Sequence, residues 1–241
     1  MPLTDPLALV VLLASFMAAT FGAAMGFGST FVFLAICTLV LPLELLVPIQ
    51  GAFLLGALVL RAWVGRRHMV WRIVWPFSFG CFIGALIGAR VYADLPAQLI
   101  ATGIAATILI TTWWPPLRMR LNIPHPFVLL GVAHTFLATL FSMGMLLQPV
   151  LLRSPLNRQQ ITATIAGAML LMEIFKVIGY QSFGFDFRPW LTLMLLSWVL
   201  AIPGVWLGQT LLRRLSEERF RRLFKALLTF FAMSLLYRAW L

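Results

Sequence analysis

The sequence predicts an all-α integral membrane protein with an inverted-topology repeat, each half being a re-entrant helical hairpin followed by three transmembrane helices. Of its 241 residues, 62% are hydrophobic and only 10% are charged, whereas a soluble domain carries about a quarter charged residues. Apolar runs near the length of a spanning helix recur from Leu7 to Trp240, which leaves no stretch for a separate aqueous domain. We therefore expect a single polytopic domain over residues 1–241, surrounded by the lipid bilayer.

Six apolar runs are long enough to cross the membrane, because at 1.5 Å per residue each covers a hydrocarbon core of about 30 Å or nearly so. They are Leu46 to Trp63, Val70 to Tyr92, Leu95 to Trp114, Gln160 to Tyr180, Trp190 to Leu212 and Phe220 to Trp240.

Two further apolar regions are interrupted by small residues. Leu7 to Leu41 is interrupted at Gly22, Gly26 and Gly28, and Phe127 to Leu152 at Ser142 and Gly144. We expect each to break into two pieces of about 10 to 15 residues, which reach only part of the way across. Such hairpins are tolerated at membrane depth only when protein buries them or when they line a cavity.

The basic residues predict the orientation. The formal charge is +11, and Lys and Arg lie almost entirely in short polar connections such as Arg213 to Lys225, as the positive-inside rule expects of cytoplasmic loops. Nucleic acid is therefore not an expected partner. The N-terminus, which has no Lys or Arg before its apolar run, is expected outside and uncleaved. Cys37 and Cys81 stand alone in apolar runs and are expected to be small core residues.

A weak internal echo supports two repeats, residues 1–120 and 121–241. Ser29, Pro42 and Leu43 match Ser142, Pro155 and Leu156 at a constant offset, and Gly84-x-x-x-Gly88 recurs as Gly204-x-x-x-Gly208. We assign the glycine pairs to close helix packing. Inverted repeats with paired broken helices are the layout of secondary transporters.

The hairpin tips, Gly26-Phe27-Gly28-Ser29-Thr30 and Ser142-Met143-Gly144 followed by Pro149, resemble those of the TauE/SafE family of sulfite exporters. In that family each half carries a glycine-rich segment ahead of further apolar spans. The resemblance runs over most of the chain. It implies a multi-pass permease of the bacterial inner membrane that exports sulfite or a small organosulfur anion.

The hairpin tips are also the predicted anion site. A helix that starts inside the membrane has backbone N–H groups without partners and the positive end of its dipole there. Ser29 and Ser142 are placed to cap two such starts, and Gln148 could donate to an oxyanion. The predicted substrate-binding residues are Gly26, Gly28, Ser29, Thr30, Ser142, Gly144 and Gln148. The alternative is that these residues only permit close packing at a helix break.

Polar groups within apolar runs are costly and are functional candidates by default. A coupling or polar relay role is predicted for Gln50, His134, Glu173 and Lys176. The alternatives are structural: Glu173 and Lys176 share a helix face and could pair or extend to the membrane surface, and His134 could be a hydrogen-bonded histidine of the bundle.

The function predicted first is export of a small anion by a secondary transporter, which is not an enzyme and needs no cofactor or metal. Since the sequence has no ATP-binding P-loop, the proton gradient or the membrane potential is the expected driving force. The sequence leaves open whether the protein forms a homo-oligomer. One alternative is a non-catalytic membrane subunit of a larger complex. A less favoured one is a membrane-embedded hydrolase, because the sequence lacks both His-Glu-x-x-His and Gly-x-Ser-x-Gly.

Overall fold

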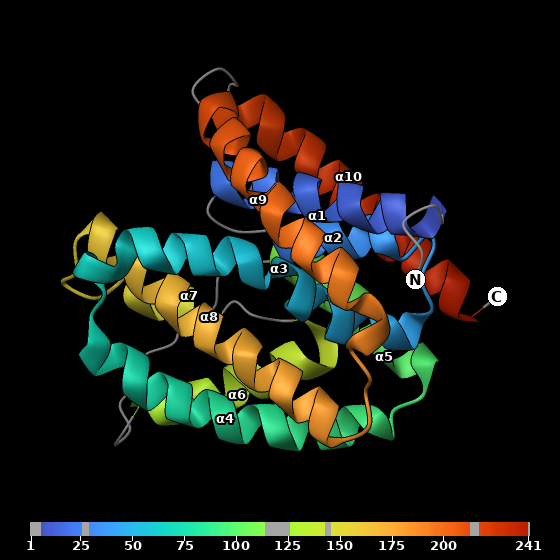
Figure 1. The fold of residues 1–241 in the computed structure, drawn as a ribbon, viewed down its shortest axis with the longest axis horizontal. Helices are drawn as coiled ribbons and strands as arrows, with labels where there is room; N and C mark the ends of the chain where they lie inside the picture. Colours follow the sequence, from blue (N-terminus) through green and yellow to red (C-terminus); the bar gives the residue numbers. More distant parts are fainter. Residues whose placement is uncertain (1–5, 26–28, 114–125, 143–145, 213–216, 241) are drawn as a thin grey trace. The chain divides into compact units, whose positions relative to one another are not determined.

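The computed structural model describes residues 6–25, 29–113, 126–142, 146–212 and 217–240, and in these residues the chain is helical, without strands (Figure 1). The helices are α1 (Pro6–Met25), α2 (Ser29–Cys37), α3 (Leu43–Gly65), η1 (Arg66–His68), α4 (Trp71–Ala93), α5 (Ala97–Trp113), α6 (Pro126–Phe141), α7 (Leu147–Leu151), α8 (Arg158–Ser182), η2 (Arg188–Trp190), α9 (Leu191–Leu212) and α10 (Glu217–Trp240).

Five helical segments among the described residues are long and apolar enough to cross a membrane, which confirms the predicted all-helical, multi-pass fold. They are Pro6–Ala23, Leu43–His68, Trp71–Ala93, Arg158–Ser182 and Arg188–Gly208. Four of these segments coincide, over most of their length, with four of the six apolar runs predicted to cross the membrane. The predicted run Leu95 to Trp114 is the helix α5, which has 17 residues and covers only about 25 Å. The predicted run Phe220 to Trp240 lies within α10.

The first interrupted region differs from its prediction in length. Its first arm, α1, has 20 residues, so the expected piece of 10 to 15 residues was wrong. The helix continues through Gly22, because one glycine costs a helix only about 1 kcal/mol and apolar neighbours on both sides offset that cost. The next helix begins at Ser29, and Gly26 and Gly28 lie outside the described residues.

The second interrupted region has arms of 16 and 5 residues, α6 and α7. α6 ends at Phe141, and Ser142 follows with a φ of 57°, the left-handed conformation that often ends a helix. Gly144 lies outside the described residues. The re-entrant path of both hairpins and the inverted repeat stay predictions.

The helices group into two compact units. The first unit comprises Met1–Ala57, Pro96–Trp114 and Asp186–Leu241, and the second comprises Leu58–Leu95 and Pro115–Phe185. Each unit therefore combines segments from both halves of the sequence. The repeats predicted at residues 1–120 and 121–241 divide the chain by sequence order, and that division also stays a prediction.

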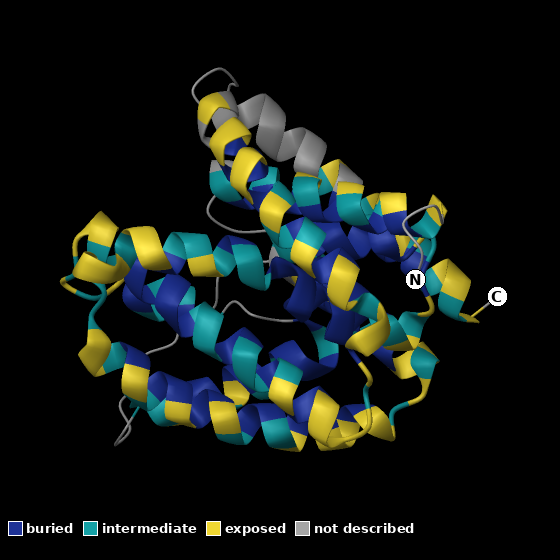
Figure 2. Cartoon of the chain, in the orientation of Figure 1, coloured by how far each residue is buried: buried dark blue, intermediate teal, exposed yellow. Residues whose placement is uncertain are grey.

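In the second unit, α4 packs against both α6 and α8, and buried and exposed residues alternate along it (Figure 2). Glycines allow the backbones of α4 and α6 to approach closely. A methyl group on Gly84 would meet the Val132 carbonyl and lie 3.1 Å from the Phe136 nitrogen. Phe77, Cys81 and Leu130 are buried beside this crossing.

In the first unit, α9 packs on α1 through a glycine pair of the same spacing. A methyl group on Gly204 would lie 3.1 Å from the Phe16 carbonyl oxygen, and one on Gly208 would collide with the Thr20 carbonyl. α9 also contacts α3, where Trp198 donates from Nε1 to the Ala52 carbonyl oxygen at 3.0 Å. The glycine pairs on α4 and α9 therefore serve close helix packing, as predicted.

Candidate functional site

Buried polar side chains gather on α6 and α8 of the second unit. His134, Thr135 and Thr139 on α6 have no exposed surface, and Glu173 and Lys176 on α8 are 5% and 1% exposed. Polar groups are expensive to bury in a membrane protein, so their concentration on two helices marks a candidate functional site. We call these five residues the α6–α8 polar cluster.

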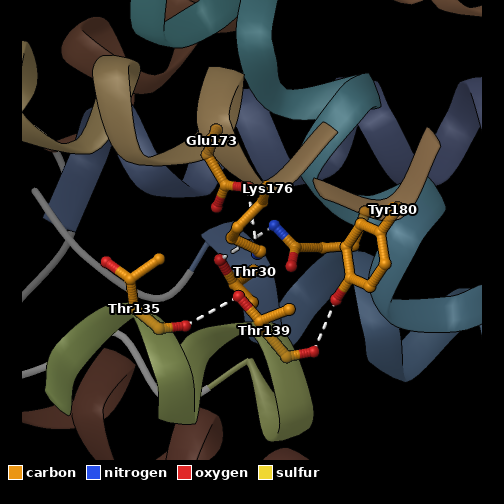
Figure 3. A network of polar contacts seen from close by, with 7 residues as sticks. Thr30, Thr135, Thr139, Glu173, Lys176 and Tyr180 are labelled. Carbon is orange, nitrogen blue, oxygen red and sulfur yellow. Dashed lines mark hydrogen bonds and ion pairs between the residues drawn. The ribbon is translucent and has the colours of Figure 1, made fainter. Parts of the chain in front are cut away.

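Glu173 and Lys176 form an ion pair inside this cluster. The Lys176 Nζ atom lies 2.9 Å from Glu173 Oε2, and the two residues are one helical turn apart on α8 (Figure 3). The structural alternative in which both side chains extend to the membrane surface is thus not adopted. Removing two charges from water costs several kcal/mol per ion before their attraction offsets it.

One hydrogen bond joins the two helices of the cluster, and a second lies next to it within α6. Tyr180 on α8 donates its hydroxyl hydrogen to the Thr139 carbonyl oxygen, and Thr139 Oγ1 donates to the Thr135 carbonyl oxygen at 2.7 Å (Figure 3). Sequence reasoning did not single out Tyr180 or Thr139. A signal was available for Tyr180, since it is one of three tyrosines in the chain and ends an apolar run.

His134 connects α6 to the start of α7. Its Nδ1 accepts the backbone N–H of Leu146 at 3.3 Å, and Phe77 packs edge-on against its ring with centroids 5.3 Å apart. An accepting Nδ1 carries no hydrogen, so the neutral ring has its N–H at Nε2. His134 Nε2 has no hydrogen-bond partner among the described residues. The ring is therefore a bonded part of the bundle with one buried donor unused.

The other candidates of the second unit lie near the gap between α6 and α7. Ser142 is buried and follows the end of α6. The expectation that it caps the next helix was wrong, because α7 is preceded by Leu146 without a side-chain cap and His134 accepts that N–H. Gln148 is half-buried on α7.

The first unit holds the remaining described candidates. Ser29 and Thr30 are the first two residues of α2 and are half-buried, and Gln50 on α3 is 1% exposed. Gln50 donates from Nε2 to Thr30 Oγ1 at 3.5 Å (Figure 3). The structure therefore joins one predicted substrate-binding residue to one predicted relay residue. The described residues contain no group of three His, Cys, Asp or Glu side chains that could hold a metal ion.

Long apolar helices and buried polar side chains define a multi-pass integral membrane protein. The family model described as sulfite exporter TauE/SafE matches residues 11–235, nearly the whole chain. The protein belongs to this family, which is a family of transporters. No curated protein and no solved structure matches the chain.

Proposed function

We propose that the protein is a secondary transporter that exports a small anion, sulfite or an organosulfur anion, from the cytoplasm across the bacterial inner membrane. The family supports the substrate class. The observation that carries the mechanism is the repeated packing of the interrupted hairpins. In each unit, a glycine pair spaced by four residues packs on the longer arm of a hairpin: Gly204 and Gly208 on α1, and Gly84 and Gly88 on α6.

This repetition supports an internal repeat. Gly204 and Gly208 lie by the carbonyls of Phe16 and Thr20, and Gly84 lies by Val132. A methyl group on Gly88 would meet Thr139 Cβ at 2.8 Å and lie 3.3 Å from the Phe136 carbonyl oxygen. The two crossings thus share one register, four residues apart on both helices. Inverted repeats of this kind move substrate by rocking one part against the other around a central site.

The proposed substrate site is formed by the hairpin tips, Gly26, Gly28, Ser29, Thr30, Ser142, Gly144 and Gln148. Its best-described part is the start of α2. The first N–H groups of a helix have no intrahelical partner, and they carry the positive end of the dipole. Since Gln50 donates to Thr30 Oγ1, the Thr30 hydroxyl hydrogen is left to donate to an anion.

The membrane potential supplies a driving force that fits export. An inside-negative potential favours outward movement of an anion by about 2.3 kcal/mol per charge for every 100 mV. Such a protein performs no covalent chemistry, so it is not an enzyme, and it needs neither a cofactor nor ATP.

The test is flux of radiolabelled sulfite in sealed proteoliposomes, with sulfate and a small sulfonate as competitors and with and without an imposed potential. We expect saturable flux that the potential accelerates. Thr30→Val should reduce flux at least about 10-fold, because it removes a hydrogen bond to a charged ligand. Thr162→Val, a matched change at an exposed threonine bonded to its own helix, should leave flux unchanged. Absence of flux of all three anions through folded protein would refute the proposal.

A further inference from the structure

The α6–α8 polar cluster contains a fully buried cation that the proposed hairpin-tip site does not use. Resting on the proposed export function, we propose that Lys176 binds the transported anion and that Glu173 is a built-in counter-ion which the anion displaces.

The ion pair is a poor device for holding the fold together. Glu173 and Lys176 sit next to each other on one helix, so their contact joins no distant segments. Replacing a buried ion pair by apolar residues of similar volume is often neutral or stabilising. The helix α8 is attached to α6 by another contact, the hydrogen bond from Tyr180 to the Thr139 carbonyl. A pair that is costly and not needed for packing points to a functional role.

Lys176 has the chemistry and the spare capacity to hold an oxyanion. An ammonium group has three N–H donors, and among the described residues its ion-pair partner is a single oxygen, Glu173 Oε2. A sulfite or sulfonate group presents three oxygens and at least one full negative charge. Such an anion can therefore replace the carboxylate and engage donors that Glu173 leaves unused.

A second unused donor lies close by. His134 is fully buried, and its Nε2 has no hydrogen-bond partner among the described residues. Buried polar atoms nearly always have a partner. An unused imidazole N–H and an under-used ammonium in one buried cluster are the donor set that an anion requires.

Displacement leaves Glu173 without its cation, and an unpaired buried carboxylate is strongly disfavoured. We therefore infer that Glu173 takes up one proton from water for each anion bound. With doubly charged sulfite, the neutral carboxyl and the Lys176–anion pair carry one net negative charge, so the inside-negative potential still favours outward movement. When the anion leaves, Glu173 loses that proton and pairs with Lys176 again, so the empty transporter returns with a neutral cluster.

Other titratable groups near the pair limit how this proton is detected. Within the unit, the other buried titratable side chains on the helices that pack together are Cys81 and Tyr92 on α4, His134 on α6 and Tyr180 on α8. A thiol and a phenol ordinarily ionise above pH 8. α7 has no titratable residue, and Val70, two residues after η1, donates to Thr164 on α8, nine residues or about 13 Å before Glu173. His134 is thus the one group that needs a separate control.

The experiment compares sulfite binding and flux in the wild type, Glu173→Gln, Lys176→Gln and Lys176→Arg. Binding is measured in detergent as sulfite-dependent thermal stabilisation, and flux in proteoliposomes. We expect Glu173→Gln to bind sulfite about 10-fold or more tightly, because its competitor is removed, while net efflux falls and sulfite–sulfite exchange persists. Lys176→Gln should weaken binding at least about 10-fold, and Lys176→Arg should restore part of it.

The proton is detected by repeating the binding series between pH 6 and pH 8. The slope of log affinity against pH should differ by about one log unit per pH unit between the wild type and Glu173→Gln. Protonation of sulfite itself affects both proteins equally, so it cancels in this difference. His134→Gln should keep the wild-type slope. Asp94→Asn, which breaks an exposed ion pair of the same unit, should change neither affinity nor slope.

Two results would overturn the inference. One is a doubly neutral variant, Glu173→Gln with Lys176→Met, that transports sulfite with wild-type KM. The other is equal weakening of sulfite binding in Glu173→Gln and Lys176→Gln when both remain folded. Failure of the proposed function is seen separately, as absence of wild-type flux. Binding that still follows the charge pattern above would then support the site without the transport role.

Discussion

Replacing Gly84 by alanine should loosen α4 from α6. The added methyl group would collide with the Val132 carbonyl and lie 3.1 Å from the Phe136 nitrogen. Both obstacles are backbone atoms of α6, so neither can rotate away. The two helices must separate, and with them the packing around this crossing.

The magnitude follows from two opposing terms. Overpacking of a close-packed site costs about 1–3 kcal/mol, and the rigid obstacle places Gly84 in the upper part of that range. Alanine is favoured over glycine in a helix by about 1 kcal/mol. The net destabilisation expected is about 1–2 kcal/mol, which corresponds to a fall of about 2–8 °C in the unfolding midpoint for a chain of this size.

Gly167→Ala is the matched control, because it makes the same chemical change in α8. Its methyl group would meet the Met69 Sδ atom at 2.8 Å, and this atom is the end of a flexible side chain that can turn aside. The helix-propensity term should then dominate, leaving the midpoint unchanged or raised. The assay is thermal unfolding of the purified protein in detergent. Equal midpoints for Gly84→Ala and Gly167→Ala would refute the reasoning.

Three further predictions concern other contacts. Gly208→Ala should lower the unfolding midpoint more than Gly204→Ala, because only the former collides with a backbone oxygen, that of Thr20; the same thermal assay compares them, and equal effects would contradict the prediction. Trp198→Phe should cost about 0.5–1.5 kcal/mol through loss of the bond to the Ala52 carbonyl, measured against the wild type. His134→Ala should leave the Leu146 N–H without its acceptor, cost about 1–3 kcal/mol and speed hydrogen exchange at α7, whereas His68→Ala on exposed η1 should not.

Much of the fold could be predicted from local sequence. Hydropathy placed α3, α4, α8 and α9 within a few residues of their observed bounds. This works because the hydrogen bonds of a membrane helix are made within the segment itself. The helix start at Ser29 was also foreseen from the neighbouring glycines. The length of α1 was missed, since a lone glycine such as Gly22 interrupts a helix only when its surroundings do not sustain it.

The candidate site was predicted less completely. Glu173 and Lys176 were paired correctly as neighbours on one helix face, because their spacing alone brings them together. The connection between His134 and Leu146 was not foreseen, since it depends on how the chain turns between α6 and α7. Nor was the role of Tyr180, whose partner Thr139 lies 41 residues away.

Composition and spacing determined that this chain is a multi-pass, all-helical membrane protein, because hydropathy and helix-breaking residues act locally. The TauE/SafE family came from the resemblance of the hairpin-tip motifs, and the family model confirms it. Which helices pack together was decided by tertiary structure. In a membrane, the helix faces that contact lipid and the faces that contact other helices are both apolar, so hydropathy does not show which helices pack together. The tertiary structure alone therefore shows the division into units that mix both halves of the sequence, the close helix crossings at the glycine pairs and the burial of Lys176 beside Glu173.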